Sequence, residues 1–448
     1  MEDKRGAGRV HEVRSAPEMD EVLRCPVLEK RGHGNSPHAE EFVLAGTLIY
    51  IWGDEHRRRR RMYAPLVSAA ALRDIEAWLG PMMQRRLAAL PRSADGQVRA
   101  DAMILARDVS LAIAARIIGL DDMESLQRLE RLGELGDRLV ASLKAHLEFE
   151  KAPGMQGASV EVIAAAKERF IAMRIAEAKA AKQCFIDEYY GPARARREAL
   201  VARHRAGESD LAQLPKDLIT LLVLNDEQLR TEPSWDEDLP VRECTMTLAA
   251  SDHTTSMAAC HVVADLFKWT AEHPEDRDRL TDLGFLRRAC NESLRLHQVT
   301  DPATNWRHAR EDVVLKSGRD IKAGDRVALW YGVGGMDADY YGTDVASFNP
   351  RRVESGNLRR PYGFAFSGGS KVCLGLALVV GSGGEEDART EDFRGDLPLM
   401  MQAFFTAGMR PDPERPAVPR SHVHASPADA REILMWKTFP VIFDKLGQ

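Results

Sequence analysis

A cysteine near the end of the chain lies in a loop suited to hold a thiolate. Cys373 belongs to the pattern F-x-x-G-x-x-x-C-x-G, which begins at Phe366 and leads into an apolar, helix-like stretch over 374–380. Metals bind the thiolate form of cysteine, which nearby backbone N–H groups or a helix N-terminus favour. Gly369 and Gly375 permit tight turns and leave room for a flat ligand. The loop predicts a metal-ligating thiolate, and the alternative is a small apolar residue beside a flexible loop.

A second motif consists of two residues that could form an ion pair on a helix. Glu292 and Arg295 are three residues apart in a segment with a helical pattern, so their side chains share one face. An ordinary surface pair at this spacing contributes only about 0.2–0.5 kcal/mol. The pair becomes informative because it precedes the cysteine loop in the same chain.

Together the two motifs resemble those of the cytochrome P450 family. The resemblance implies that Cys373 is the proximal ligand of haem iron and that the cofactor is heme b. It also implies that Glu292, Arg295 and Arg351 form a structural triad. Arginine suits the haem propionates because it is always charged and can donate two N–H groups at once. The positions that match the family's cofactor-binding residues are His56, Arg60, Arg307, Phe366, Gly369, Lys371 and Gly375.

Oxygen chemistry in this family uses a distal helix that carries an acid and an alcohol for proton delivery. The matching segment is 248–256, and it departs from the family pattern. If Thr254 is the family's threonine, His253 replaces the acid; if Asp252 is the acid, His253 occupies the threonine position. The first alignment retains the hydroxyl and is preferred. Histidine titrates near neutrality, so His253 or Asp252 is the expected proton relay.

Five consecutive arginines, 57–61, have an alternative explanation. Blocks of like charge are usually solvated faces or nucleic-acid patches. The chain as a whole is mildly acidic, with 62 Lys and Arg against 68 Asp and Glu, and no second basic cluster of this density accompanies the run. We therefore expect no nucleic-acid partner.

The composition predicts a large enzyme of the cytoplasm. The chain has 448 residues, of which 44% are hydrophobic and 29% charged, so it can bury a sizeable core. No run of eighteen apolar residues is present, and we expect neither a membrane anchor nor a signal peptide. Six scattered cysteines without C-x-x-C spacing favour a reducing compartment.

The expected fold is mainly α with small β-sheets (α+β), in one cytochrome P450 domain over 1–448. Residues 1–52 should form a partial small sheet and pocket loops, with an apparently shortened N-terminal part. The region 53–300 should be a helical body, and 301–448 should hold the haem loop and the C-terminal region. Glycines after Val380 predict a loop insertion near 381–395, because each costs about 1 kcal/mol inside a helix. Helical patterns cover 69–90, 100–120, 123–150 and 160–208, and strand patterns cover 310–330 and 433–443.

By resemblance, the chain is a haem-thiolate monooxygenase that inserts one oxygen atom of O2 into a small lipophilic substrate, a product of specialised metabolism. A separate ferredoxin-type protein would supply electrons and dock on Lys371, Arg359 and Arg360. One rival is a haem-thiolate peroxygenase, or a rearranging or dehydrating enzyme that needs no reductase. The other is a non-catalytic haem-binding protein.

Overall fold

The structure, a computed structural model, describes residues 8–30, 42–94, 96–150, 157–297, 299, 305–352, 360–382, 393–422 and 433–446. The chain divides into two compact units. Unit 1 comprises Met1–Arg31, Val67–Arg107 and Thr254–Gln448, and unit 2 comprises Gly32–Leu66 and Asp108–His253. A single domain over 1–448 stays a prediction.

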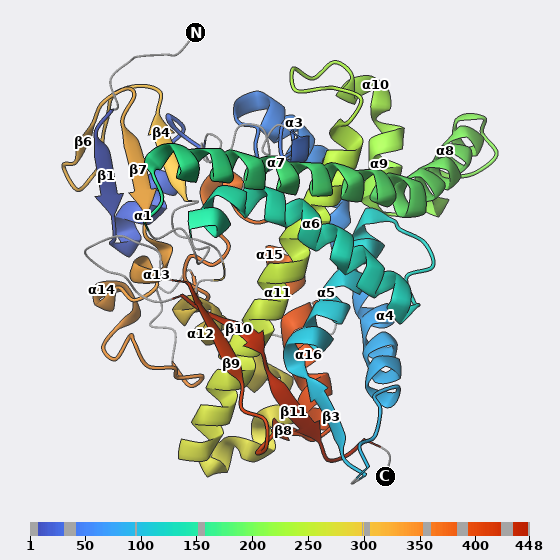
Figure 1. Cartoon of the computed structure of the whole chain (residues 1–448), viewed down its shortest axis with the longest axis vertical. Helices are drawn as coiled ribbons and strands as arrows, with labels where there is room; N and C mark the ends of the chain where they lie inside the picture. The colour runs from blue at the N-terminus through green and yellow to red at the C-terminus, as the bar shows by residue number, and fades with distance from the viewer. Residues whose placement is uncertain are drawn as a thin grey trace. The chain divides into compact units, whose positions relative to one another are not determined.

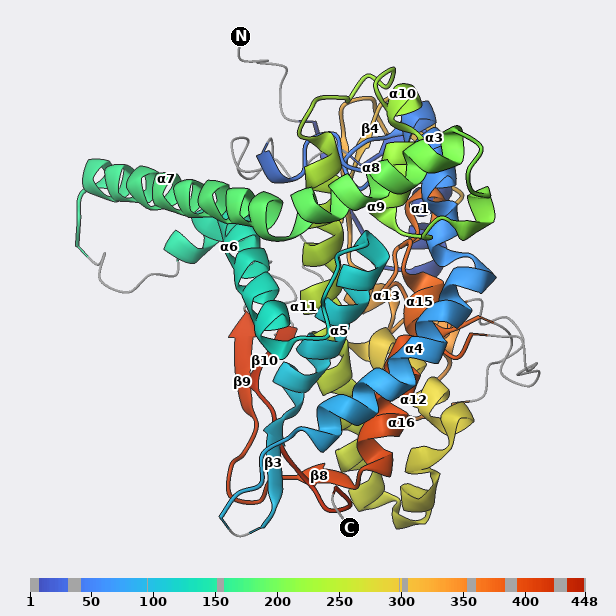
Figure 2. The same cartoon turned by 90° about the vertical axis from the view of Figure 1, so that its right-hand side faces the viewer.

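Unit 2 is helical, and its described residues include no β-strand. Two long helices also contribute residues to unit 1, α5 (Ala102–Ile118) and α11 (Leu239–Glu272). Figure 2 shows α6 and α7 packed against each other. The remaining helices of unit 2 are α3 (Gly53–Tyr63), α6 (Leu126–Glu150), α7 (Val160–Phe185), α8 (Gly191–Arg205), α9 (Leu218–Leu224) and α10 (Asp226–Leu229), with 3-10 turns η1 (Ala64–Val67, which ends in unit 1) and η3 (Leu211–Gln213).

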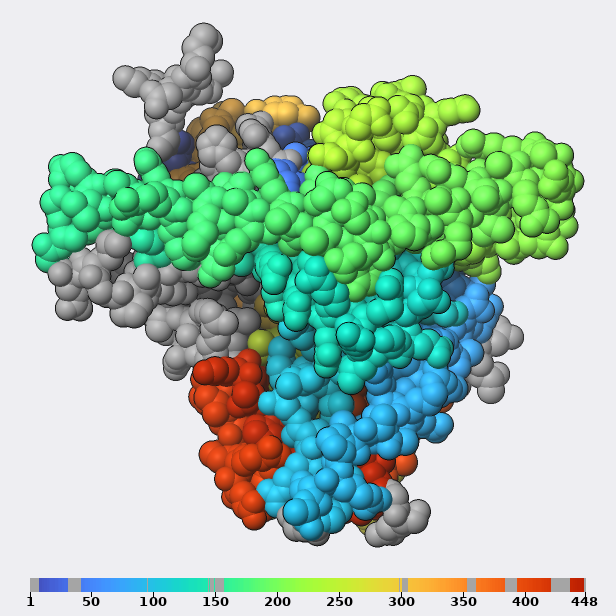
Figure 3. Space-filling model, turned by 45° about the vertical axis from the view of Figure 1, so that its right-hand side comes forward, coloured from blue at the N-terminus to red at the C-terminus, as the bar shows by residue number. Residues whose placement is uncertain are grey.

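The predicted helical run over 160–208 contains one defect. A π-helical turn, η2 (Ile186–Tyr190), joins α7 to α8. Pro192 has no N–H to continue the α-helical ladder, and the Gly191 N–H instead reaches the carbonyl of Ile186, five residues back. A Cβ at Gly191 would lie 2.9 Å from that oxygen. The two helices consequently form one continuous ridge in the space-filling view (Figure 3).

Unit 1 contains a four-stranded sheet with the order β1-β7-β4-β2. The strand β1 (Val10–Val13) is parallel to β7 (Arg326–Leu329), and the other pairings, with β4 (Trp306–Ala309) and β2 (Leu28–Glu29), are antiparallel. Within the described residues β1 forms one edge of the sheet, and a shortened N-terminal part stays a prediction. Figure 1 shows β1, β7 and β4 side by side.

A helix in the N-terminal region was not predicted. The expectation for 1–52 is a partial small sheet with pocket loops, but α1 (Ala16–Arg24) forms a nine-residue helix between β1 and β2. Ser15 is its N-cap, and a proline lies at its first turn. Met19, Val22 and Leu23 are buried in a core shared with the sheet and with Phe364. Burial of this apolar face stabilises a helix that would be marginal in isolation.

Three smaller sheets complete the β-structure of unit 1. The predicted strands near 310–330 and 433–443 are confirmed, whereas β3, β8 and β9 were not predicted. The sheets consist of β3 (Val98–Asp101), β11 (Pro440–Phe443) and β8 (Met409–Pro411); of β9 (Val418–His422) and β10 (Ile433–Thr438); and of β5 (Val313–Val314) and β6 (Asp320–Ile321).

The helices of unit 1 pack mainly around α16, which contacts α12, α15 and α4. None of the helices in the described parts of the chain is long and apolar enough to span a bilayer. The helices and turns are α4 (Ala69–Ala88), η4 (Pro274–Thr281), α12 (Leu283–Leu296), α13 (Tyr331–Gly334), α14 (Ala338–Tyr341), η6 (Gly369–Lys371), α15 (Leu376–Val380) and α16 (Asp396–Thr406).

The helix after the cysteine loop stops where the glycines predict. α15 ends at Gly381, whose φ is +89°, and α16 begins at Asp396. Between them, the Ser382 N–H donates to the Phe393 carbonyl at 2.8 Å, and the Phe393 N–H donates to the Ser382 hydroxyl at 3.0 Å. These two bonds join the ends of the predicted insertion, of which 383–392 lie outside the described residues.

Candidate functional site

The cysteine loop exposes a single thiol. Cys373 is solvent-exposed, and its backbone N–H donates to the carbonyl of Phe366 at 2.9 Å. Of the other five cysteines, three are buried and two are partly buried. Burial raises the pKa of the Cys244 and Cys290 thiols, which disfavours their thiolates. Exposure therefore distinguishes Cys373 as the cysteine available to an external metal.

Two glycines of the loop are required by geometry. Gly369 has φ +60°, and a Cβ there would lie 1.9 Å from the Leu23 carbonyl oxygen of α1. A side chain at this position would push the loop away from α1. At Gly375 a Cβ would lie 3.7 Å from the Cys373 sulfur, so a longer side chain could cover the thiol. The glycine pattern thus sets the loop on α1 and leaves the sulfur accessible.

Arg360 supports the loop from within the unit. Its guanidinium donates to the Ser367 carbonyl at 2.7 Å and pairs with Asp20 of α1 at 2.6 Å. The hydroxyls of Ser367 and Tyr331 are also hydrogen-bonded, at 2.8 Å. Arg360 was expected on a docking face, but these contacts give it a structural role. Lys371 is partly buried in η6, and Arg359 lies outside the described residues.

The predicted ion pair is buried and bidentate. Arg295 Nε and Nη2 donate to the two carboxylate oxygens of Glu292 at 2.8 and 2.7 Å. Arg295 also donates to the carbonyls of Gly335 and Val345. Such a charge-assisted fork is among the stronger polar contacts in proteins. This pair is therefore a buried, bidentate ion pair and not the exposed pair that spacing alone predicts.

The third member of the triad is Arg352, and the prediction of Arg351 is wrong. Arg352 Nε donates to Glu292 Oε1 at 3.0 Å. Arg351 instead pairs with Asp276 at 2.7 Å and with Glu275 at 3.0 Å. Neighbouring side chains leave the backbone in different directions, so only one of the two arginines can reach the buried carboxylate.

Arg307 is a buried cation with an unused donor. It lies on β4 with 2% of its surface exposed, and its Nη1 donates to the Trp306 carbonyl at 2.9 Å. Its buried Nε has no partner among the described residues. An unsatisfied buried guanidinium is costly, and a carboxylate would satisfy it. This orphaned donor fits the haem propionate that the resemblance assigns to Arg307.

The distal segment lies within α11, which is helical from Leu239 to Glu272. Asp252 is buried, and His253 Nε2 lies 3.3 Å from Asp137 Oδ1 of α6 and 4.0 Å from Asp252 Oδ2. Ligand atoms of these three residues lie within 4.8 Å of one another. His253 and Asp137 are 36% and 46% exposed, so this is an imidazole beside two acids and not a closed metal site. Thr254 is partly buried, and Asp137 was not foreseen because it comes from another helix.

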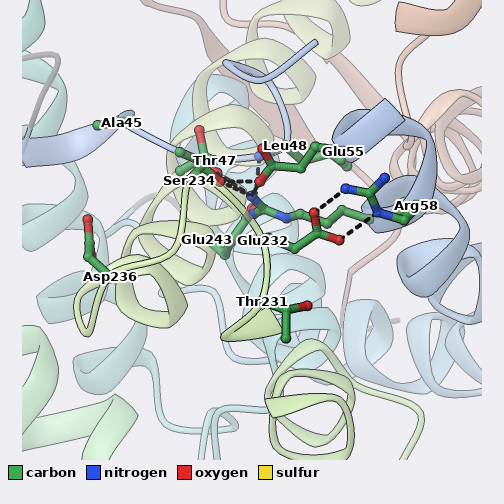
Figure 4. A network of polar contacts seen from close by, with 12 residues as sticks. Ala45, Thr47, Leu48, Glu55, Arg58, Thr231, Glu232, Ser234, Asp236 and Glu243 are labelled. Carbon is green, nitrogen blue, oxygen red and sulfur yellow. Dashed lines mark hydrogen bonds and ion pairs between the residues drawn. The ribbon is translucent and has the colours of Figure 1, made fainter. Parts of the chain in front are cut away.

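The arginine run is distributed around α3 and does not form one basic face. Arg59 is fully buried and pairs with Glu243 of α11, while Arg58 pairs with Glu232 (Figure 4). His56 is buried one turn before Arg59, and Arg60 is partly buried. Arg57, Arg58 and Arg59 each pair with an acidic side chain of unit 2.

Comparisons with known proteins agree with these motifs. A family model described as "Cytochrome P450" matches residues 175–379. Cytochrome P450 94B3 of Arabidopsis thaliana is 35% identical over 123 residues, which are 23% of this chain and 23% of that protein. A bifunctional cytochrome P450/NADPH--P450 reductase 2 of Bacillus subtilis (strain 168) is 27% identical over 184 residues, 37% of this chain and 17% of that protein. The matched segments thus span less than a quarter of these relatives.

Solved structures match over nearly the whole chain. CYP109E1 from Bacillus megaterium, in complex with testosterone, has a TM-score of 0.62 at 16% identity and covers 98% of this chain and 92% of its own. CYP154A1 from Streptomyces coelicolor A3(2) has a TM-score of 0.59 at 18% identity, with 97% and 91% coverage. At these identities the likeness shows the fold, which is mainly α with small sheets as predicted.

Proposed function

Because the chain belongs to the cytochrome P450 family, we propose that it is a haem-thiolate monooxygenase. It inserts one oxygen atom of O2 into a small lipophilic molecule of specialised metabolism, and the other atom leaves as water after two electrons and two protons are consumed. The observation that carries this proposal is the exposed Cys373 thiol on a glycine loop that α1 supports. When bound, heme b supplies the O2 and redox chemistry.

The residues of the chain bind and orient the cofactor. The Cys373 thiolate holds the iron, and Phe366, Gly369 and Gly375 shape the loop around the sulfur. Arg307 holds a propionate through its orphaned Nε. His56, Arg60 and Lys371 supply further propionate contacts, as the resemblance implies. Guanidinium and imidazolium groups neutralise the carboxylates and keep the charge of the cofactor compatible with a buried site.

Proton delivery is assigned to the segment from Asp252 to Thr254. The Thr254 hydroxyl orients water near the reacting oxygen, and His253 passes protons inward from solvent. The Asp137 carboxylate, 3.3 Å from His253 Nε2, supports this role, since it would orient the ring. Replacement of the family's acid by histidine also favours one second candidate, a peroxygenase. Turnover with peroxide that exceeded turnover with a reductase would favour the peroxygenase.

Electrons come from a separate ferredoxin-type protein, and the reaction takes place in the cytoplasm. The Bacillus subtilis relative carries a reductase by name. For this chain the expectation rests on the sequence alone. Comparison of turnover with ferredoxin, flavodoxin and peroxide as electron or oxygen sources tests it.

The decisive experiment is the spectrum of the reduced, haem-loaded protein under carbon monoxide. The proposed thiolate gives a strongly red-shifted band, which Cys373→Ala abolishes. Cys25→Ala, at a partly buried cysteine of the same unit, leaves the band in place. A wild-type protein without this band would overturn the proposed function. Candidate substrates are then screened for the spectral shift that displacement of a distal ligand produces.

A further inference from the structure

A lysine stands opposite Arg307 in the four-stranded sheet. In the antiparallel pair of β2 and β4, Leu28 is opposite Ala309, and Glu29 is opposite His308. The same register, continued by one residue, places Lys30 opposite Arg307. Directly opposed residues of antiparallel strands project to the same face. Lys30 and Arg307 thus share a face of the sheet.

That face is the buried one. Arg307 and Ala309 alternate with more exposed residues along β4, and Leu28, two residues before Lys30, is fully buried. Because side chains alternate between faces along a strand, Lys30 continues the side that Leu28 occupies. Lys30 itself is only partly buried, so its stem lies along the core while its surface still reaches solvent.

The two cations lie together without a carboxylate. Neither Lys30 nor Arg307 forms an ion pair with an acidic side chain in the described parts of the chain. Burial, and then the charge of Arg307, lowers the pKa of Lys30 to about 8. Like charges at opposed positions of a sheet are destabilising, and an unpaired buried cation costs several kcal/mol. A bound anion between them would remove both costs.

We propose that Lys30 is a second cation for the haem carboxylate that Arg307 binds. This inference rests on the proposed function and adds a binding residue to it. The planar guanidinium fixes the carboxylate through directed N–H donors, and the flexible ammonium adds charge from the opposite strand. The sheet register thereby aligns two cations on one propionate.

The test compares Lys30→Gln and Lys30→Arg in the haem-loaded protein. The first readout is the rate of haem transfer to an excess of apomyoglobin. Loss of a charge-assisted contact should accelerate transfer by about 10- to 100-fold for Lys30→Gln, and Lys30→Arg should restore most of the retention. Lys437→Gln, at an exposed lysine of the same unit, is the matched control and should change nothing.

The second readout is the haem reduction potential. Removal of a cation beside a propionate stabilises the ferric form, so Lys30→Gln should lower the potential, and Lys30→Arg should not. A carboxylate could also come from an acidic substrate. In that case Lys30→Gln would weaken the spectral binding of a long-chain fatty acid and leave haem transfer and potential unchanged, which overturns the proposal.

The outcome for Lys30 is distinguishable from that of the proposed function. If the wild-type protein holds no thiolate-bound haem, the proposed function itself fails. If wild type and Lys30→Gln both show the red-shifted carbon monoxide band with equal haem transfer and equal potential, only the role of Lys30 fails. Should Lys30→Gln not fold, the isosteric Lys30→Met variant is measured in its place, with the same expected direction.

Discussion

Two buried arginines show how differently this chain uses the same side chain. Arg59, in unit 2, is surrounded by acceptors, which include the Glu243 carboxylate, the Gly46 carbonyl and the Ser234 hydroxyl at 3.0 Å. Arg307, in unit 1, has one carbonyl acceptor at 2.9 Å and no carboxylate partner among the described residues, and the buried Nε of both arginines lacks a partner there. Their burial is almost equal, at 0% and 2% exposure.

The difference separates a structural arginine from a ligand-binding one. A guanidinium cannot lose its proton at ordinary pH, so burial must be compensated by acceptors. For Arg59 the protein supplies them, and α3 is fastened to the segment 44–48 and to α11 as a result. For Arg307 the described residues supply no carboxylate, whereas Arg59 pairs with Glu55 and Glu243. The lack of a carboxylate partner, and not burial or an unpartnered Nε by itself, is therefore the indicator of an anionic ligand.

The largest expected effect comes from removing the main carboxylate partner of Arg59, so that it lacks this partner as Arg307 does. Glu243→Ala removes the main carboxylate and should lower the free energy of unfolding by about 3–5 kcal/mol, since the buried cation is left uncompensated. Urea unfolding followed by circular dichroism measures it. Glu237→Ala, which removes an exposed partner of Arg230, is the control and should have little effect. Equal losses in both variants would contradict the importance assigned to a carboxylate partner for a buried arginine.

Asp396 extends the comparison to a buried acid. Unlike an arginine, a carboxyl group can avoid a buried charge by staying protonated. Burial raises the pKa of its carboxyl from 3.8 to about 7, although backbone N–H groups at the start of α16 oppose the shift. A raised pKa contributes stability that is full below pH 4 and is lost as pH rises to about 7, up to about 4 kcal/mol. Asp396→Asn should flatten this part of the stability-versus-pH curve.

That prediction is checked by unfolding at several pH values from 4 to 8. Asp339→Asn, at an exposed carboxyl of the same unit, serves as the reference. If the wild-type protein becomes more stable between pH 4 and 7 and Asp396→Asn follows the same curve, the assigned role of Asp396 is wrong.

The smallest effect should separate two neighbouring arginines. Arg352→Ala removes a charge-assisted hydrogen bond to the buried Glu292 and several carbonyl contacts, and should cost about 1.5–3 kcal/mol. Arg351→Ala removes a side chain that is 42% exposed and that does not contact Glu292, and should cost less. Thermal unfolding of the two variants ranks them. The reverse order would restore Arg351 to the triad.

Several residues of the candidate site could be predicted from the sequence because they belong to motifs of short spacing. Cys373 with its glycines, and Glu292 with Arg295, form motifs whose residues lie close together in the sequence, so both motifs can be recognised there, whereas the approach of Gly369 to Leu23 cannot. Arg352 was missed because the turn that follows Asn349 decides which of two adjacent side chains faces inward. Lys30 was missed because its partner is more than two hundred residues away and only strand register brings them together.

The same contrast applies to the fold. Long helices such as α4 and α6 were predicted because their apolar pattern repeats over many turns. The helix α1 was missed because nine residues give too short a pattern, although its proline and Ser15 were available signals. The short strands β3 and β9 obtain most of their stability from distant partners, which a local pattern does not reveal.

The paired bonds between Ser382 and Phe393 have a practical consequence for protein engineering. These bonds hold the two ends of the intervening stretch close together. A change in the length of that stretch should therefore have little effect on α15 or α16. Doubling a flexible loop costs only about 0.6 kcal/mol in closure entropy. This position should accept a shortened turn or a grafted peptide tag while the thiol-bearing loop keeps its place on the protein.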